Sequence, residues 1–131
     1  MPSENNSSNI ALTITFTDPD LTAEKRNEDV GKLLKELKAR REIEAVERVR
    51  DPHPPEGNKG VGSFLVGMLT AQVTVENAKK ALGFLGDRLG NKQITIEAEV
   101  NGIKMKVSAA SKEEVAFALQ QTDAFIEKHR V

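Results

Sequence analysis

Hydrophobic and polar residues alternate strictly near the N-terminus, in residues 10–16 with the sequence IALTITF. Alternation with a period of two is typical of a strand with one buried face. The predicted buried side carries Ile10, Leu12, Ile14 and Phe16. Residues 43–49, IEAVERV, have a similar pattern and predict a second strand.

A longer alternating stretch, QITIEAEVNGIKMKVS, contains Asn101-Gly102, the preferred dipeptide of a two-residue hairpin turn. This turn fixes which residues of the two strands face one another. The apolar face pairs Val100 with Ile103, Ala98 with Met105 and Ile96 with Val107, and the polar face pairs Glu99 with Lys104 and Glu97 with Lys106. Each acid then faces a base, which favours this register.

Apolar residues recur every three or four positions in four further segments, which predicts helices. The segments are residues 22–41, 61–71, 74–89 and 112–129. Thr22 and Thr74 are suited to cap two of these helices, and Ser111 with Glu114 fits a capping box at the last one. The middle pair, 61–71 and 74–89, is equally consistent with two helices or one bent helix.

Together these elements predict an α+β fold in the order β-α-β-α(α)-β-β-α. The short return after the first helix favours a right-handed βαβ unit, so the first two strands should be parallel. We expect a four-stranded mixed sheet with helices packed mainly on one face. Residues 1–8 read as a flexible tail and 9–131 as one domain, interrupted by a Pro/Gly-rich loop at 52–60.

Composition excludes several classes of function. The chain has no cysteine, so it contains neither disulfides nor cysteine-based zinc sites. Its 20 acidic and 19 basic residues give a net charge of −1, so nothing indicates a basic face for nucleic acid. The apolar run after Val61 reaches Gln72 before it is long enough for a membrane span. We expect a cytoplasmic protein.

Candidate chemical motifs in the chain are weak. Gly57 and Gly62 fit the spacing of a phosphate loop, but Ser63 and Phe64 stand where that loop requires Lys and Ser or Thr. His53 reads as a loop residue and His129 as a favourable charge at a helix end, while Asp18 and Asp20 suit a turn. These observations nominate no catalytic, cofactor-binding or metal-binding residue, and we expect a non-enzyme.

Several segments resemble one family: DLTAEKRNEDVGKLLKELKAR, IEAVERV, the PPEGNKG loop, the apolar stretch after it, and ITIEAEVNGIKMKVSAASKEE. The chain, over roughly residues 9–129, is similar to the effector-associated constant component domain of bacterial conflict systems. It departs from that family in being more polar after Gln72. The resemblance implies a non-catalytic adaptor that couples sensor and effector proteins, with partners such as a trypsin-like or caspase-like protease and possible homo-oligomers.

The glycine-containing apolar stretch VGSFLVGMLTAQV, with the loop before it, is the predicted contact surface of this adaptor. Its candidate interaction residues are Lys59, Val61, Phe64, Leu65 and Met68. The alternative interpretation, which the pattern favours, is that Phe64, Leu65, Met68 and Leu69 belong to the core. Two other functions stay open: a small-ligand-binding domain with its site under the 52–60 loop, and a protease substrate or inhibitor that presents that loop.

Overall fold

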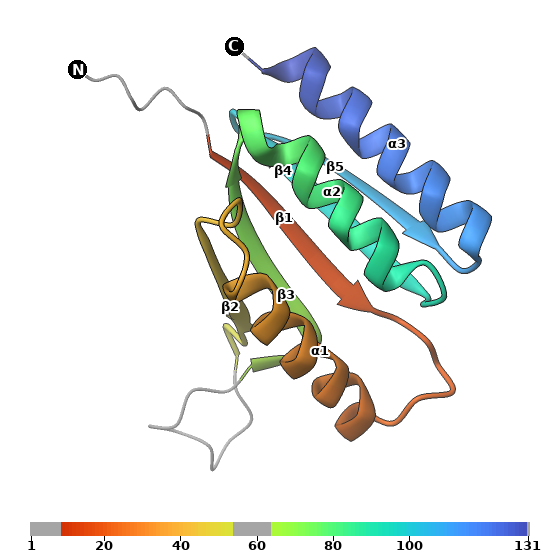
Figure 1. The fold of residues 1–131 in the computed structure, drawn as a ribbon. Coiled ribbons are helices and arrows are strands. Elements are labelled where there is room, and N and C mark those ends of the chain that lie inside the picture. The colour runs from red at the N-terminus through yellow and green to blue at the C-terminus, as the bar shows by residue number, and fades with distance from the viewer. Residues whose placement is uncertain (1–8, 54–63, 131) are drawn as a thin grey trace.

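A five-stranded antiparallel sheet carries three helices on one of its faces (Figure 1). The computed structural model describes residues 9–53 and 64–130. The strands are β1 (Asn9–Phe16), β2 (Ala45–Arg50), β3 (Phe64–Thr74), β4 (Ile94–Val100) and β5 (Ile103–Ala109). The helices are α1 (Ala23–Lys38), α2 (Val75–Leu89) and α3 (Lys112–His129).

The strands lie in the order β2-β3-β1-β4-β5. The first six elements, β1-α1-β2-β3-α2-β4, therefore form the β-α-β-β-α-β arrangement of ferredoxin-like folds. The hairpin strand β5 and the helix α3 extend this unit at one side. The α+β class and the helices on one face are as the sequence predicts.

The expectation of a four-stranded mixed sheet is wrong. β3 lies between β1 and β2 and pairs antiparallel with both, so the first two strands run in the same direction without being neighbours. The crossover through α1 therefore skips one strand position, which β3 later fills. Every neighbouring pair of strands is antiparallel.

The predicted helix at 61–71 is also wrong over its described part, because residues 64–74 form β3. Leu69, Ala71 and Val73 are buried against the helices, while the residues between them lie on the other face. The apolar run at the start of this segment satisfies a helical and a strand period alike. Pairing with two neighbouring strands decides in favour of the strand.

The local predictions for the hairpin and the helix caps are confirmed. All five predicted pairs of the hairpin occur in β4 and β5, and Asn101 and Gly102 have φ of 52° and 81°, as their turn requires. Thr22, Thr74 and Ser111 accept hydrogen bonds from the backbone N–H three residues on. Glu114 accepts a 2.7 Å hydrogen bond from the N–H of Ala110, one residue before the expected partner in a capping box.

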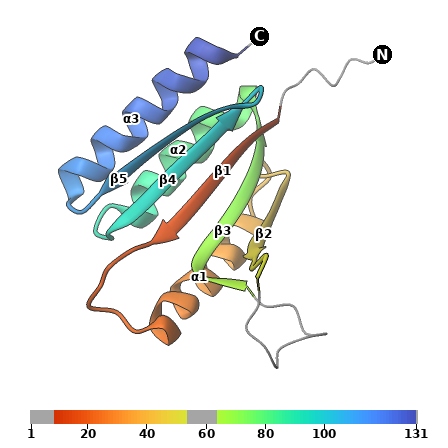
Figure 2. The ribbon, with the colours of Figure 1, turned by 180° about the vertical axis from the view of Figure 1, so that it is seen from behind.

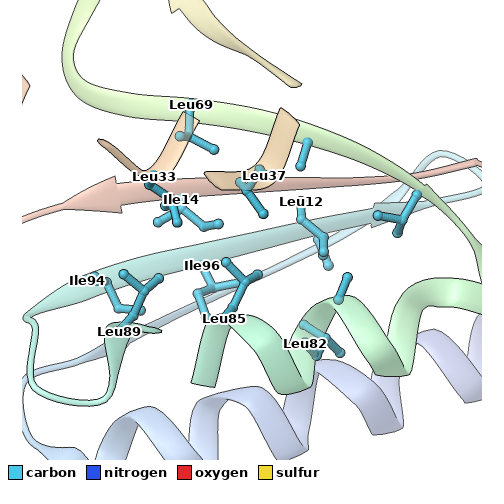
Figure 3. Packing of buried hydrophobic residues seen from close by; sticks show 14 of the residues in the cluster. Leu12, Ile14, Leu33, Leu37, Leu69, Leu82, Leu85, Leu89, Ile94 and Ile96 are labelled. Atoms are coloured by element: carbon cyan, nitrogen blue, oxygen red, sulfur yellow. The ribbon is translucent and has the colours of Figure 1, made fainter. Parts of the chain in front are cut away.

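The hydrophobic core lies between the sheet and the helices (Figure 3). The sheet contributes Leu12, Ile14 and Ile96, which meet leucines from α1 and α2. The helical leucines are Leu33, Leu37, Leu82, Leu85 and Leu89. The predicted buried side of the first strand is thus correct, because Ile10, Leu12, Ile14 and Phe16 are all buried. Burying this apolar surface is the main force that holds the layers together.

The opposite face of the sheet carries none of the described helices (Figure 2). Hydroxyl groups pair across neighbouring strands there, between Thr13 and Thr70 at 2.9 Å and between Thr95 and Ser108 at 3.0 Å. Such polar cross-strand pairs suit a sheet face in contact with water.

Gly67 sits where the pairing of β2 with β3 loses its regular register. Its φ of +69° is in the left-handed region, and a Cβ there would lie 3.3 Å from both the Arg26 Cβ and the Phe16 carbonyl oxygen. We expect Gly67→Ala to lower the free energy of unfolding by about 2 kcal/mol, because it adds backbone strain and crowding. Urea unfolding would measure the loss.

Gly31→Ala is the control for that substitution, because Gly31 is helical and a Cβ there would meet nothing within 4 Å. It should raise stability by up to about 1 kcal/mol through helix propensity. Equal stability of the Gly67 variant and the native chain would contradict the strain assigned to this position.

Candidate interaction surfaces

The predicted interaction residues lie at the beginning of β3 or outside the described part of the chain. Lys59 and Val61, like residues 54–60 of the predicted loop, fall outside the described residues. Phe64 is 40% exposed, whereas Leu65 and Met68 are half-buried. Met68 pairs with Thr15 and therefore lies on the face without helices.

Two arginines of β2 approach the exposed Phe64. The guanidinium carbons of Arg48 and Arg50 lie 5.3 and 5.6 Å from the centre of its ring, within the range of cation–π contacts. Phe64 is thus an exposed aromatic residue bordered by positive charge. This arrangement suits contact with a partner that is apolar and acidic.

Asn27 of α1 ties this end of β3 to the helical layer. Its Oδ1 accepts hydrogen bonds from the Gly67 N–H at 2.9 Å and from Arg48 Nη2 at 2.5 Å. The buried Nε of Arg48 has no partner among the described residues. The irregular start of β3 is therefore held by a side chain of α1 rather than by regular strand pairing alone.

A second surface, which the sequence did not indicate, is a groove of about 730 Å³ between α2 and α3. We call it the α2–α3 groove. Apolar and small residues form most of its lining, including Leu82, Gly83, Gly86, Val115, Ala116 and Leu119. Phe117 lines it as well and is 58% exposed, the largest value among the described exposed large hydrophobic residues.

The groove exists because α2 carries glycines where it faces α3. A Cβ on Gly83 would meet nothing within 4 Å, so this position opens directly onto free space. A Cβ on Gly86 would lie 2.9 Å from Leu119 Cδ1, so this glycine allows α3 to approach α2 closely. Gly86 thus allows the helices to pack closely, and Gly83 leaves the groove without a side chain from this position.

Charged residues of both signs also line the groove. Lys79 of α2 and Asp123 of α3 form an ion pair across the groove, with Nζ and Oδ2 3.4 Å apart. The other charged lining residues are Asp87, Lys112 and Glu113. A mainly apolar lining that also contains charged residues is typical of a protein–protein contact surface.

The remaining candidates from the sequence have local structural roles. Asp18 accepts a 2.9 Å hydrogen bond from the Asp20 N–H in the turn after β1. The His53 N–H donates to Asp51 Oδ1 at 2.9 Å. His129 packs against Phe125, with ring centres 4.6 Å apart.

Residues 9–53 and 64–130 contain neither a cluster of metal-binding side chains nor a membrane-spanning helix. Within these ranges, no group of three or more His, Cys, Asp or Glu side chains is placed to hold a metal ion. No helix in the described ranges is both long enough and apolar enough to span a bilayer.

The α2–α3 groove left only a faint signal in the sequence. Gly83 and Gly86 are one turn apart inside a helical pattern, where glycine usually costs stability. Phe117 falls outside the apolar stripe of α3, which is formed by Val115, Ala118, Thr122 and Ile126. Interior glycines and an aromatic residue outside the stripe are compatible with uncovered apolar surface, but they do not show which two helices form it.

Comparison with known proteins gives one distant structural likeness. No protein-family model matches the chain, and no curated protein matches it. A crystal structure titled as a dabb family protein with a ferredoxin-like fold, from Mesorhizobium loti, is similar to it with 18% sequence identity and a TM-score of 0.36. The match covers 79% of this chain and 96% of that chain.

Proposed function

We propose that this chain is a non-catalytic adaptor domain that binds partner proteins through the α2–α3 groove. The observation that carries the proposal is the exposed Phe117 beside an apolar groove of about 730 Å³. Exposed aromatic residues next to apolar pockets are typical centres of protein interfaces. Leaving Phe117 in water has a cost that a bound partner would remove.

The shape and chemistry of the groove favour an amphipathic helix as the partner segment. The axes of α2 and α3 run side by side (Figure 1), and residues of both helices form the mainly apolar lining. A partner helix can place a row of apolar side chains into such a groove. The charged lining residues of both signs match the mixed polar face that such a helix carries.

The resemblance to effector-associated constant component domains supports the same reading. It implies that the partners are effector or regulatory proteins of a bacterial conflict system, such as a trypsin-like or caspase-like protease. The adaptor would couple such an effector to a sensor. The exposed Phe64, bordered by Arg48 and Arg50, supplies a second surface at the other side of the fold, which an adaptor with two partners requires.

The test fills the groove without disturbing the fold. Gly83→Leu places a side chain in the open space at Gly83, and Gly31→Leu makes the same change on α1, where a Cβ also meets nothing within 4 Å. Both variants should keep or raise the melting temperature, because leucine is the better helix former by about 0.8 kcal/mol. Proteins retained from native lysate by the native chain should be retained by Gly31→Leu and lost by Gly83→Leu.

Two results would contradict this proposal. One is undiminished retention of the same partners by a folded Gly83→Leu variant. The other is undiminished retention by Phe117→Ser, which removes the exposed aromatic ring. Circular dichroism identifies a variant that does not fold before binding is measured. If Gly83→Leu does not fold, partner retention by Phe117→Ser tests the proposal instead.

A small-ligand-binding domain is the second candidate, because the groove volume of about 730 Å³ falls within the range of ligand pockets. A metabolite that occupies the groove would raise the melting temperature of the native chain through linkage. It would leave the Gly83→Leu variant unaffected. These two results together would favour a ligand-binding domain over the adaptor.

A further inference from the structure

A small polar cleft lies on the other side of α2, between α1 and the connection from α2 to β4. Its volume is about 210 Å³, several times the ~30 Å³ that one water molecule occupies in the liquid. Phe16, Leu33 and Leu89 are its apolar lining residues. The charged lining residues are Lys25, Asp29, Lys32, Glu36, Arg88 and Lys92.

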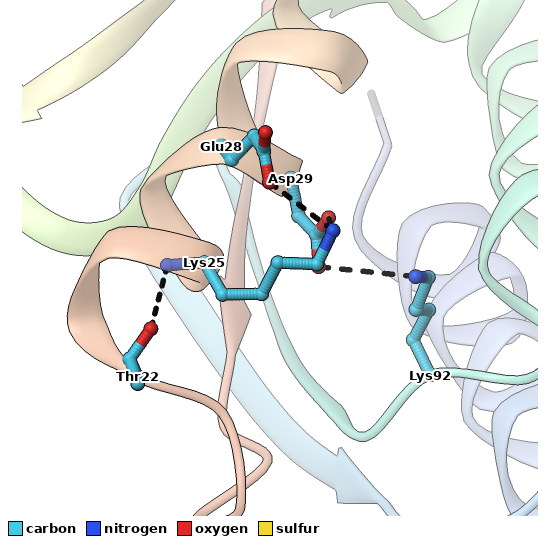
Figure 4. Close-up of polar contacts among 5 residues, drawn as sticks. All are labelled: Thr22, Lys25, Glu28, Asp29 and Lys92. Carbon is cyan, nitrogen blue, oxygen red and sulfur yellow. Dashed lines mark hydrogen bonds and ion pairs between the residues drawn. The ribbon is translucent and has the colours of Figure 1, made fainter.

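Asp29 is the buried acidic residue of this cleft, with only 7% of its surface exposed. Lys25 and Lys92 approach it from opposite sides (Figure 4). The Lys25 Nζ is 3.6 Å from Oδ1 and the Lys92 Nζ is 3.8 Å from Oδ2, both longer than a hydrogen bond. Asp29 Oδ2 is buried and receives no hydrogen bond from the described residues.

A buried carboxylate oxygen without a donor is costly, so this atom calls for a partner that can donate. Neither neighbouring lysine reaches it at hydrogen-bonding distance, although the cleft beside it has room for a small molecule. A ligand that fits Asp29 must therefore present a proton on an O–H or N–H group.

The other charges of the cleft favour a ligand that is negative overall. Four basic and two acidic side chains line it. Glu36 already holds Arg88 through two hydrogen bonds of 2.8 and 2.6 Å, and Glu28 holds Lys25 at 3.2 Å. Among the described residues, Lys32 forms no ion pair within 4 Å and the ammonium group of Lys92 forms one with Asp29 alone, so both have unused donors. A bare metal cation would be repelled by this set.

We infer that the cleft binds a small oxyanion that keeps a proton at neutral pH, namely a phosphate group. The anionic oxygens would accept hydrogen bonds from Lys25, Lys32 and Lys92, and the P–OH group would donate to Asp29 Oδ2. Sulfate has the same tetrahedral shape but carries no proton at neutral pH. It would therefore place a second acceptor against the carboxylate, which is repulsive.

The phosphate group has two possible sources, free inorganic phosphate and a phosphomonoester. A phosphomonoester has a second pKa of about 6, so it would bind as the protonated monoanion, which is its minor form at pH 7. The inference is independent of the α2–α3 groove, because none of the residues of one site lines the other. A failure to bind phosphate would not contradict the adaptor proposal. Loss of the adaptor proposal would not contradict phosphate binding in the cleft.

The experiment is a calorimetric titration of the full chain at pH 7 and constant ionic strength, with sodium phosphate, sodium sulfate and glycerol 3-phosphate as probes. Phosphate should bind at least about tenfold more tightly than sulfate, the ratio expected when one charged hydrogen bond is gained or lost. Tighter binding of glycerol 3-phosphate than of phosphate would assign the site to phosphomonoesters. The opposite order would assign it to free phosphate.

The variant Asp29→Asn offers an amide that donates as well as accepts, so it should bind phosphate and sulfate with similar affinity. Glu28→Gln is the matched control, because Glu28 lies one residue away, also contacts Lys25 and is exposed. It should keep the preference for phosphate. Lys92→Gln should weaken phosphate binding and carries the test if Asp29→Asn does not fold.

Three results would overturn the inference. They are equal affinity of the native chain for phosphate and sulfate, no phosphate binding up to about 10 mM, and an unchanged preference in folded Asp29→Asn. If Asp29→Asn does not fold, undiminished phosphate binding by Lys92→Gln would overturn it as well.

Discussion

Leu69→Lys is expected to unfold the chain. Leu69 is 0% exposed in the middle of β3, where it faces the helices and pairs with Ile14 of β1. A lysine there would bury an unpaired ammonium group and remove apolar contacts, a change that costs more than about 4 kcal/mol. The whole stability of a domain of this kind is about 5–15 kcal/mol. Circular dichroism and urea unfolding would show the loss of structure.

Thr70→Lys is the matched control, one residue further along β3. Thr70 lies on the face without helices, opposite Glu47 of β2, so a lysine there can reach water and an acidic neighbour. It loses the hydrogen bond with Thr13, which is worth about 1 kcal/mol. A tolerated Leu69→Lys, or equal losses at both positions, would contradict the alternation that defines β3.

Arg40→Ala should cost about 2 kcal/mol at pH 7. Glu42 is only 7% exposed, and its carboxylate accepts a hydrogen bond from Arg40 Nε. The Arg40 guanidinium also lies 4.1 Å from the centre of the Phe84 ring, so it connects the end of α1 to α2. The cost stays below that of a fully buried pair, because Arg40 is partly in water.

The cost of Arg40→Ala should depend on pH. Burial raises the pKa of Glu42. The hydrogen bond from Arg40, a backbone hydrogen bond and the charges of Arg40 and Lys80 together lower this pKa by more, so that it lies below its ordinary value. A lowered folded-state pKa stabilises the fold above the unfolded value of about 4.3, and this contribution is lost as the pH falls through the folded-state pKa. Urea unfolding at pH 7 and pH 3.5 should therefore show a smaller difference between Arg40→Ala and the native chain at the lower pH.

Arg41→Ala serves as the control for this pair, because Arg41 is exposed and adjacent. It should change stability by less than about 0.5 kcal/mol at either pH. A cost of Arg40→Ala that stays constant between the two pH values would show that the ring contact with Phe84, rather than the carboxylate of Glu42, accounts for the stabilisation.

The parts of the fold that the sequence predicted correctly are those decided by neighbouring residues. The strand at residues 10–16 alternates cleanly, the hairpin register follows from Asn101-Gly102, and each helix cap needs only a hydroxyl three residues before its donor. β3 could not be predicted in this way. Its apolar beginning fits either period, and its partners β1 and β2 are distant in sequence.

Predicting the interaction surfaces from the sequence is harder still, because they are formed by residues that are distant in the chain. The sequence singled out Phe64, Leu65 and Met68, and the fold leaves Phe64 exposed while half-burying the other two. The α2–α3 groove could not be inferred, because its lining is contributed by two helices separated by the whole β4–β5 hairpin. Only the packing of α3 beside α2 makes Gly83 and Phe117 part of one surface.

The strand order has a consequence for how copies of this chain can associate. The two outer strands are β2 and β5. β5 exposes Lys104 and Lys106, while β2 carries Arg48 and Arg50 and has irregular pairing at its end. Charged and irregular edges disfavour the addition of a further strand. Copies of the chain that assemble should therefore stack through their faces, and growth into a continuous intermolecular sheet should be suppressed.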